Sequence, residues 1–152
     1  MSQRLNYVHH ARDSFRALDA VRIQVAKGKL PQRLLDLVYL RVSQINGCAY
    51  CIAVHSRDLL TAGLAVEALP LLQVWRETGA LFSEAERAAL AWAESVTRVA
   101  DTGVPQADFD AARAVFDEAD LAELTIAIGL MNAFNRLAVS FRTPPPAIGT
   151  AA

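Results

Sequence analysis

Apolar residues recur at helical spacing in every segment after the first few residues, and no stretch shows the alternation of a strand. We therefore predict an all-α protein, a compact multi-helix bundle. The chain has 152 residues, the length of one ordinary domain. We expect a single domain over 1–152, with a core of about 30–141. A triple proline after Thr143 predicts that residues 143–152 form a loose tail.

Turn and capping signals divide the chain into its expected helices. Asn46-Gly47 is a turn signal, and Ser83 with Glu86 has the spacing of a capping box. Asp120 with Glu123 is the expected cap of the last helix. The helix that begins at Pro31 is apolar on most sides, so we expect it to be buried. The expected helices span residues 11–26, 31–45, 48–62, 67–76, 83–101, 105–116 and 120–141.

Composition excludes several classes of protein. Apolar residues make up 53% of the chain and charged residues 20%, which excludes a disordered protein. The net charge is -1, and no block of Lys and Arg indicates binding to nucleic acid or to a membrane surface. The first 16 residues lack the apolar stretch of a secretory signal, so we expect a cytoplasmic protein. The segment 120–141 approaches the length that spans a bilayer, but its polar residues favour a buried helix in a soluble bundle: Glu123, Asn132, Asn135 and Arg136.

Both cysteines and one histidine lie in a single short motif. On a helix, Cys48 and Cys51 are i,i+3 neighbours, and Cys51 and His55 are i,i+4 neighbours, so all three share one face. Two thiols one turn apart can form a disulfide, and an imidazole one turn further on can accept a thiol proton. In a cytoplasmic protein such a pair is more often catalytic or metal-binding than structural. The motif therefore predicts a dithiol redox site with its own base.

A carboxylate is expected beside this histidine. If the helices on either side of Asn46-Gly47 pack as an antiparallel pair, Asp36 and His55 lie at equal heights above the turn, within about 3 Å. Asp36 would then orient the imidazole in a proton relay. The alternative places Asp36 on a solvent-facing stripe with Arg33 or Arg41.

The spacing leaves the attacking thiol open. Cys48 would follow the turn at Gly47 and lie at a helix N-terminus, where the dipole lowers a thiol pKa. Cys51 has the imidazole beside it, which slightly favours Cys51. Tyr50 could direct its hydroxyl group into the same pocket, although simple packing is the more common role of such a tyrosine.

The residues from Asp36 to His55, DLVYLRVSQINGCAYCIAVH, resemble the core motif of the AhpD-like alkylhydroperoxidases of the carboxymuconolactone decarboxylase superfamily. The resemblance continues through 83–92 and 124–136 and covers about 30–141. It implies a helical fold that assembles into homotrimers or homohexamers. It also implies thiol-dependent reduction of hydroperoxides, with Cys48 and Cys51 as the reactive pair, His55 as the relay histidine and a protein dithiol as the electron donor. The position of Asp36 is usually Glu in that family, so the relay carboxylate is one methylene shorter here.

The leading hypothesis is therefore a hydroperoxide reductase that needs no metal, flavin or haem. A redox module or sensor without peroxide turnover is the main alternative, and the shorter Asp36 side chain favours it. The superfamily name also suggests decarboxylation of a muconolactone, a reaction for which the cysteines are unnecessary. A structural zinc site would have Cys48, Cys51 and His55 as ligands and would need a fourth from elsewhere, such as His9 or His10. We expect these last two histidines to be exposed.

Overall fold

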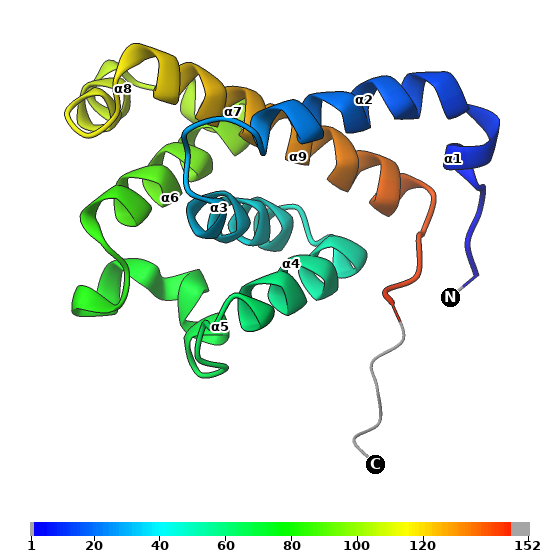
Figure 1. Ribbon diagram of the computed structural model, residues 1–152, viewed down its shortest axis with the longest axis horizontal. Coiled ribbons are helices and arrows are strands. Elements are labelled where there is room, and N and C mark those ends of the chain that lie inside the picture. Colours follow the sequence, from blue (N-terminus) through cyan, green and yellow to red (C-terminus); the bar gives the residue numbers. More distant parts are fainter. Residues whose placement is uncertain (1, 147–152) are drawn as a thin grey trace.

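The core is built around one helix, α3 (Gln32–Ile45), which lies at the centre of the computed structural model (Figure 1). The structure describes residues 2–146. Leu35, Val38 and Val42 pack into a cluster with side chains of α6 (Glu84–Thr97) and α9 (Glu118–Ser140). Leu37 and Leu40 face a second cluster that includes α4 (Ala49–Thr61). Because both faces of α3 are covered, its predicted burial is confirmed.

The remaining elements are helices that surround this core. The all-α prediction is confirmed, and residues 2–146 contain no strand. Within that range no helix has both the length and the apolar character needed to cross a membrane. The other elements are α1 (Tyr7–His10), α2 (Arg12–Val25), α5 (Ala68–Leu71), the 3-10 helices η1 (Leu72–Glu77) and η2 (Gly79–Leu81), α7 (Val99–Thr102) and α8 (Gln106–Arg113).

Four of the expected helix boundaries were wrong, and one of them is the end of the helix expected over 105–116, because α8 ends at Arg113. The expected helix over 67–76 is instead α5 followed by η1, and Val74 has a non-helical backbone. The expected helix over 83–101 ends at Thr97, and α7 follows as a separate turn. The last helix begins earlier than expected, because Asp117 is its N-cap and accepts a hydrogen bond from the Asp120 backbone N–H at 2.8 Å. Asp120 is therefore a first-turn residue and not the cap.

Other local signals were correct. Ser83 and Glu86 form the predicted capping box. Gly47 has a φ of 66°, a left-handed conformation that glycine adopts without strain, at the turn between α3 and α4. His9 and His10 are exposed on α1, as expected. Residues 143–146 have no regular structure, and the rest of the expected tail lies outside the described residues.

The turn between α3 and α4 is attached to α9. The side-chain amide of Asn46 donates to the Oδ1 atoms of Asn132 and Asn135, each at 3.0 Å. Asn135 is fully buried and donates in turn to Ser43 Oγ at 3.1 Å. Asn132 and Asn135, two of the polar residues within the otherwise apolar α9, thus hold the start of α4 in place. Helix α2 lies alongside α9 (Figure 1), and this position brings α1 and α2 near the start of α4.

Candidate functional site

Cys48 and Cys51 form a disulfide at the first turn of α4. Their Cα atoms are 5.4 Å apart, within the range that disulfides require. Cys48 is the N-cap residue of the helix, and its sulfur accepts a hydrogen bond from the Cys51 backbone N–H at 3.3 Å. This position exposes the Cys48 sulfur to the positive end of the helix dipole. Local helix geometry alone therefore brings the two sulfurs together.

The two cysteines face different cavities. Cys51 and His55 both line a cavity of about 300 Å³, which α4 encloses together with α1, α2 and α9. Most of its lining is apolar, and Phe15 and Phe134 contribute aromatic rings. Cys48 lines a separate cavity of about 560 Å³ beside the C-terminal end of α9. Tyr50 is 37% exposed and lines both cavities. Only Cys51 therefore shares a cavity with the imidazole.

The imidazole of His55 is largely buried, with 13% of the side chain exposed, and lacks a hydrogen bond at one nitrogen. Nδ1 has no hydrogen-bond partner among the described residues, and its nearest carboxylate oxygen, Asp58 Oδ2, lies at 3.6 Å. The ring of Tyr39 packs against the imidazole with centroids 5.3 Å apart. Burial lowers the pKa of His55 to about 4, although the Asp58 carboxylate acts in the opposite direction. The imidazole is therefore neutral near pH 7, and the lowered pKa makes it a weaker base than a free imidazole.

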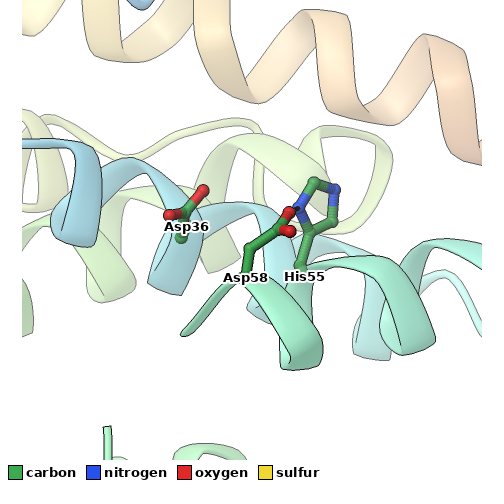
Figure 2. Close-up of side chains that lie close together, drawn as sticks. All are labelled: Asp36, His55 and Asp58. Atoms are coloured by element: carbon green, nitrogen blue, oxygen red, sulfur yellow. Dashed lines mark ion pairs between the residues drawn. The ribbon is translucent and has the colours of Figure 1, made fainter. Parts of the chain in front are cut away.

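Asp36 lies beside His55, as the helix geometry predicted. One ligand-type atom from each of Asp36, His55 and Asp58 lies within 4.8 Å of the others (Figure 2). Asp36 is only 6% exposed and accepts a hydrogen bond from Gln32 Nε2 at 2.9 Å. Burial raises the pKa of the Asp36 carboxyl, and the Gln32 hydrogen bond opposes this shift.

The alternative position of Asp36, on an exposed stripe with Arg33 or Arg41, was wrong. Asp36 is buried, and both arginines are paired with other acids on α6. Arg33 Nε donates to Glu86 and Arg41 Nε to Glu94, each at 2.7 Å. Asp36 therefore faces the histidine without a neighbouring cation from its own helix.

Two neighbours of His55 were missed in the sequence. Asp58 follows His55 by three residues on α4, and this spacing alone indicates that their side chains lie on one face. Tyr39 lies three residues after Asp36 on α3, and burial raises its hydroxyl pKa to about 12. The alternative zinc set of Cys48, Cys51 and His55 is not what the structure assembles. Within residues 2–146, the cluster of potential metal ligands is Asp36, His55 and Asp58.

Comparison with known proteins agrees with these features. The family model for the carboxymuconolactone decarboxylase family matches residues 12–95. A protein of unknown function from Agrobacterium tumefaciens, assigned provisionally to antioxidant defence as AhpD, is 37% identical in sequence. Its structure superposes with a TM-score of 0.91 over 97% of this chain and 100% of that one. The uncharacterized protein YdfG of Bacillus subtilis (strain 168) is 29% identical over 140 residues, which are 92% of this chain and 95% of YdfG.

A more distant protein shares the fold. Two structures of the debrominase Bmp8 superpose with a TM-score of 0.78 at 18–19% identity, over 92% of this chain and 74–75% of Bmp8. The fold alone therefore does not specify a peroxide as the substrate. The family match spans more than half of the 152 residues, and the Agrobacterium protein matches nearly the whole chain. The chain belongs to the carboxymuconolactone decarboxylase family and is an AhpD-like member of it.

Proposed function

We propose that this protein is a thiol-dependent reductase of organic hydroperoxides with a role in antioxidant defence. The observation that carries the proposal is the cavity that Cys51 and a neutral His55 both line, next to a second cysteine within disulfide distance. The apolar lining of that cavity suits an alkyl or aryl hydroperoxide. The relationship to the Agrobacterium protein supports the same class of activity.

The reaction begins with the reduced dithiol. His55 accepts the thiol proton of Cys51, and the resulting thiolate attacks the distal oxygen of ROOH. The O–O bond breaks, the protonated imidazole gives its proton to the leaving alkoxide, and ROH and a Cys51 sulfenic acid form. The Cys48 thiol then attacks that sulfur and releases water, which leaves the disulfide. An external dithiol reduces the disulfide by exchange and is itself oxidised.

The carboxylate of Asp36 stabilises the protonated imidazole during this cycle. Its position within 4.8 Å of the histidine supports the role, and this separation leaves room for a water to bridge the shorter side chain to the imidazole. The protein dithiol donor and the homotrimer or homohexamer implied by the resemblance remain predictions.

The proposal is tested with reduced wild-type protein and cumene hydroperoxide. In the presence of dithiothreitol, the protein should consume peroxide faster than dithiothreitol alone. Without a reductant, each chain should lose both thiols and consume one peroxide. A disulfide that forms without faster peroxide loss would contradict the peroxidase and favour the redox sensor instead.

Replacing His55 with glutamine should lower the rate of peroxide reduction at neutral pH by about 100-fold, because the amide cannot accept the thiol proton. The loss should shrink as the pH rises toward about 9, where a free thiol ionises without a base. The measurement is the initial rate of peroxide loss between neutral pH and pH 9. The matched control is His9→Gln, which changes an exposed histidine on α1. An equal rate for His55→Gln and wild type at neutral pH would exclude the relay.

A further inference from the structure

The Nδ1 edge of the His55 ring is turned toward two carboxylates (Figure 2). Figure 2 shows Nδ1 of His55 directed at Asp58, with Asp36 on the same side. Nδ1 is buried and has no hydrogen-bond partner in the described part of the chain. A buried ring nitrogen without a hydrogen bond is costly, because its desolvation is not compensated. This nitrogen is therefore suited to an additional ligand.

The two carboxylates are not neutralised by arginine or lysine. Within residues 2–146, neither Asp36 nor Asp58 forms an ion pair with a basic side chain other than His55. The two arginines of α3, Arg33 and Arg41, form ion pairs with Glu86 and Glu94 instead. Asp36 keeps one hydrogen bond, from Gln32, which leaves its other oxygen without a hydrogen bond from the described chain. Two carboxylates this close together repel each other, and a cation between them would relieve the repulsion.

We propose that Asp36, His55 and Asp58 form a binding site for a divalent transition-metal cation such as Zn²⁺. Bonds of about 2.0–2.2 Å to nitrogen and oxygen place the ligand atoms of one ion roughly 3.0–3.6 Å apart. His55 Nδ1 and Asp58 Oδ2 are already 3.6 Å apart, and all three groups lie within 4.8 Å. The remaining contraction lies between Asp36 and the other two groups, while the Asp58 side chain, which is 49% exposed, can rotate toward the ion.

The site is open to solvent on its outer side. Asp36 and Asp58 line a surface cavity of about 370 Å³, together with Gln32, Thr61 and Ala62. Water can therefore enter and complete the coordination of an ion held by three protein ligands. An imidazole with carboxylates suits zinc and its neighbours in the first transition series, whereas Mg²⁺ and Ca²⁺ prefer oxygen ligands alone. We therefore expect Zn²⁺ to bind in preference to Mg²⁺.

Metal binding at this site would block the proton relay. This consequence rests on the function proposed above, whereas the binding of the metal does not depend on it. A metal on Nδ1 leaves the proton of a neutral imidazole on Nε2. That nitrogen points away from the two carboxylates (Figure 2). With a proton on Nε2, the ring cannot accept the proton of Cys51. The metal thus acts as an inhibitor and takes no part in the reaction.

Binding is tested by titrating Zn²⁺ into the disulfide form of the protein by calorimetry, because the disulfide removes both thiols as competing ligands. We expect one Zn²⁺ per chain, and excess Mg²⁺ should not displace it. Asp58→Asn is the main variant, since an exposed side chain can be changed without affecting the fold, and it should weaken binding by about tenfold or more. Asp110→Asn, an exposed aspartate on α8, is the matched control and should bind as wild type does. No binding by wild type, equal binding by Asp58→Asn, or displacement by Mg²⁺ would overturn the site.

The effect on catalysis is tested separately, in a single turnover of pre-reduced protein with cumene hydroperoxide. Dithiothreitol is omitted because it binds Zn²⁺. The rate of each protein with Zn²⁺ is compared with its own metal-free rate. Zn²⁺ should slow the wild-type reaction about tenfold or more. The same concentration of Zn²⁺ should slow the reaction of Asp58→Asn much less. Equal inhibition of both would assign the effect to the thiols and overturn the inhibitory role. If the protein binds Zn²⁺ in the calorimeter but consumes no peroxide, the metal site stands and the peroxidase fails.

Discussion

Replacing Cys51 with serine is expected to abolish peroxide turnover, so that peroxide disappears no faster than with the reductant alone. Cys51 is the cysteine that shares a cavity with His55, and the serine hydroxyl is far less acidic than a thiol. Without a thiolate in that cavity, no sulfenic acid forms and no disulfide follows. The measurement is steady-state loss of cumene hydroperoxide in the presence of dithiothreitol.

Replacing Cys48 with serine distinguishes the roles of the two thiols. The Cys51 thiolate should still react once with peroxide, but the sulfenic acid has no partner in the chain and should accumulate. A reagent that labels sulfenic acids should therefore mark Cys48→Ser and not Cys51→Ser. The reverse pattern would assign the attack to Cys48, which lies at the helix N-terminus. Turnover at the wild-type rate in both variants would exclude the dithiol mechanism.

Replacing Glu94 with alanine is expected to lower the free energy of unfolding by about 3–5 kcal/mol, more than any of the other substitutions above. Glu94 is 7% exposed and accepts hydrogen bonds from Arg41 at 2.7 Å, Trp75 at 3.0 Å and Arg76 at 2.5 Å. Its removal would leave the largely buried Arg41 guanidinium without its carboxylate partner. The same carboxylate joins α3, η1 and α6, so the helix that carries Asp36 should loosen. Chemical denaturation measures the change.

The control for this variant is Glu67→Ala, an exposed glutamate whose side chain forms no hydrogen bond with any residue in the range 2–146. It should change stability by no more than about 0.5 kcal/mol. An equally small change for Glu94→Ala would show that the hydrogen bonds of Glu94 make no net contribution to the free energy of unfolding.

The Glu94 network should also make stability depend on pH. Burial raises the pKa of Glu94, but the hydrogen bonds from Arg76, Trp75 and Arg41 outweigh burial and lower it below the ordinary value of 4.5. A lowered pKa stabilises the folded state above pH 4.5, and this contribution is lost as the pH falls through the folded-state pKa. The stability difference between wild type and Glu94→Ala should therefore shrink below pH 4.5. A difference that stays constant with pH would contradict this expectation.

Features that depend on neighbours in the chain could be predicted from the sequence. The spacing of Cys48, Cys51 and His55 places them on one face of a helix, whatever that helix packs against. The capping box at Ser83 and the turn at Gly47 are likewise local. The errors in helix boundaries also have local causes, since several acids compete for one cap between Asp117 and Asp120. Predicting that Asp36 and His55 lie close together required only one assumption about tertiary structure, which is that α3 and α4 pack against each other on either side of their turn.

The partners of the charged residues were decided by the tertiary structure. Asp36 could have paired with Arg33 or Arg41, and nothing in the sequence shows that α6 supplies Glu86 and Glu94 to these arginines instead. The separate cavities for Cys48 and Cys51 likewise depend on where α1, α2 and α9 lie. The physical reason is that helical spacing determines which side chains share a face. Burial of the whole core determines which helix faces pack together. It therefore also determines which charged side chains form ion pairs within the chain and which remain available to a ligand.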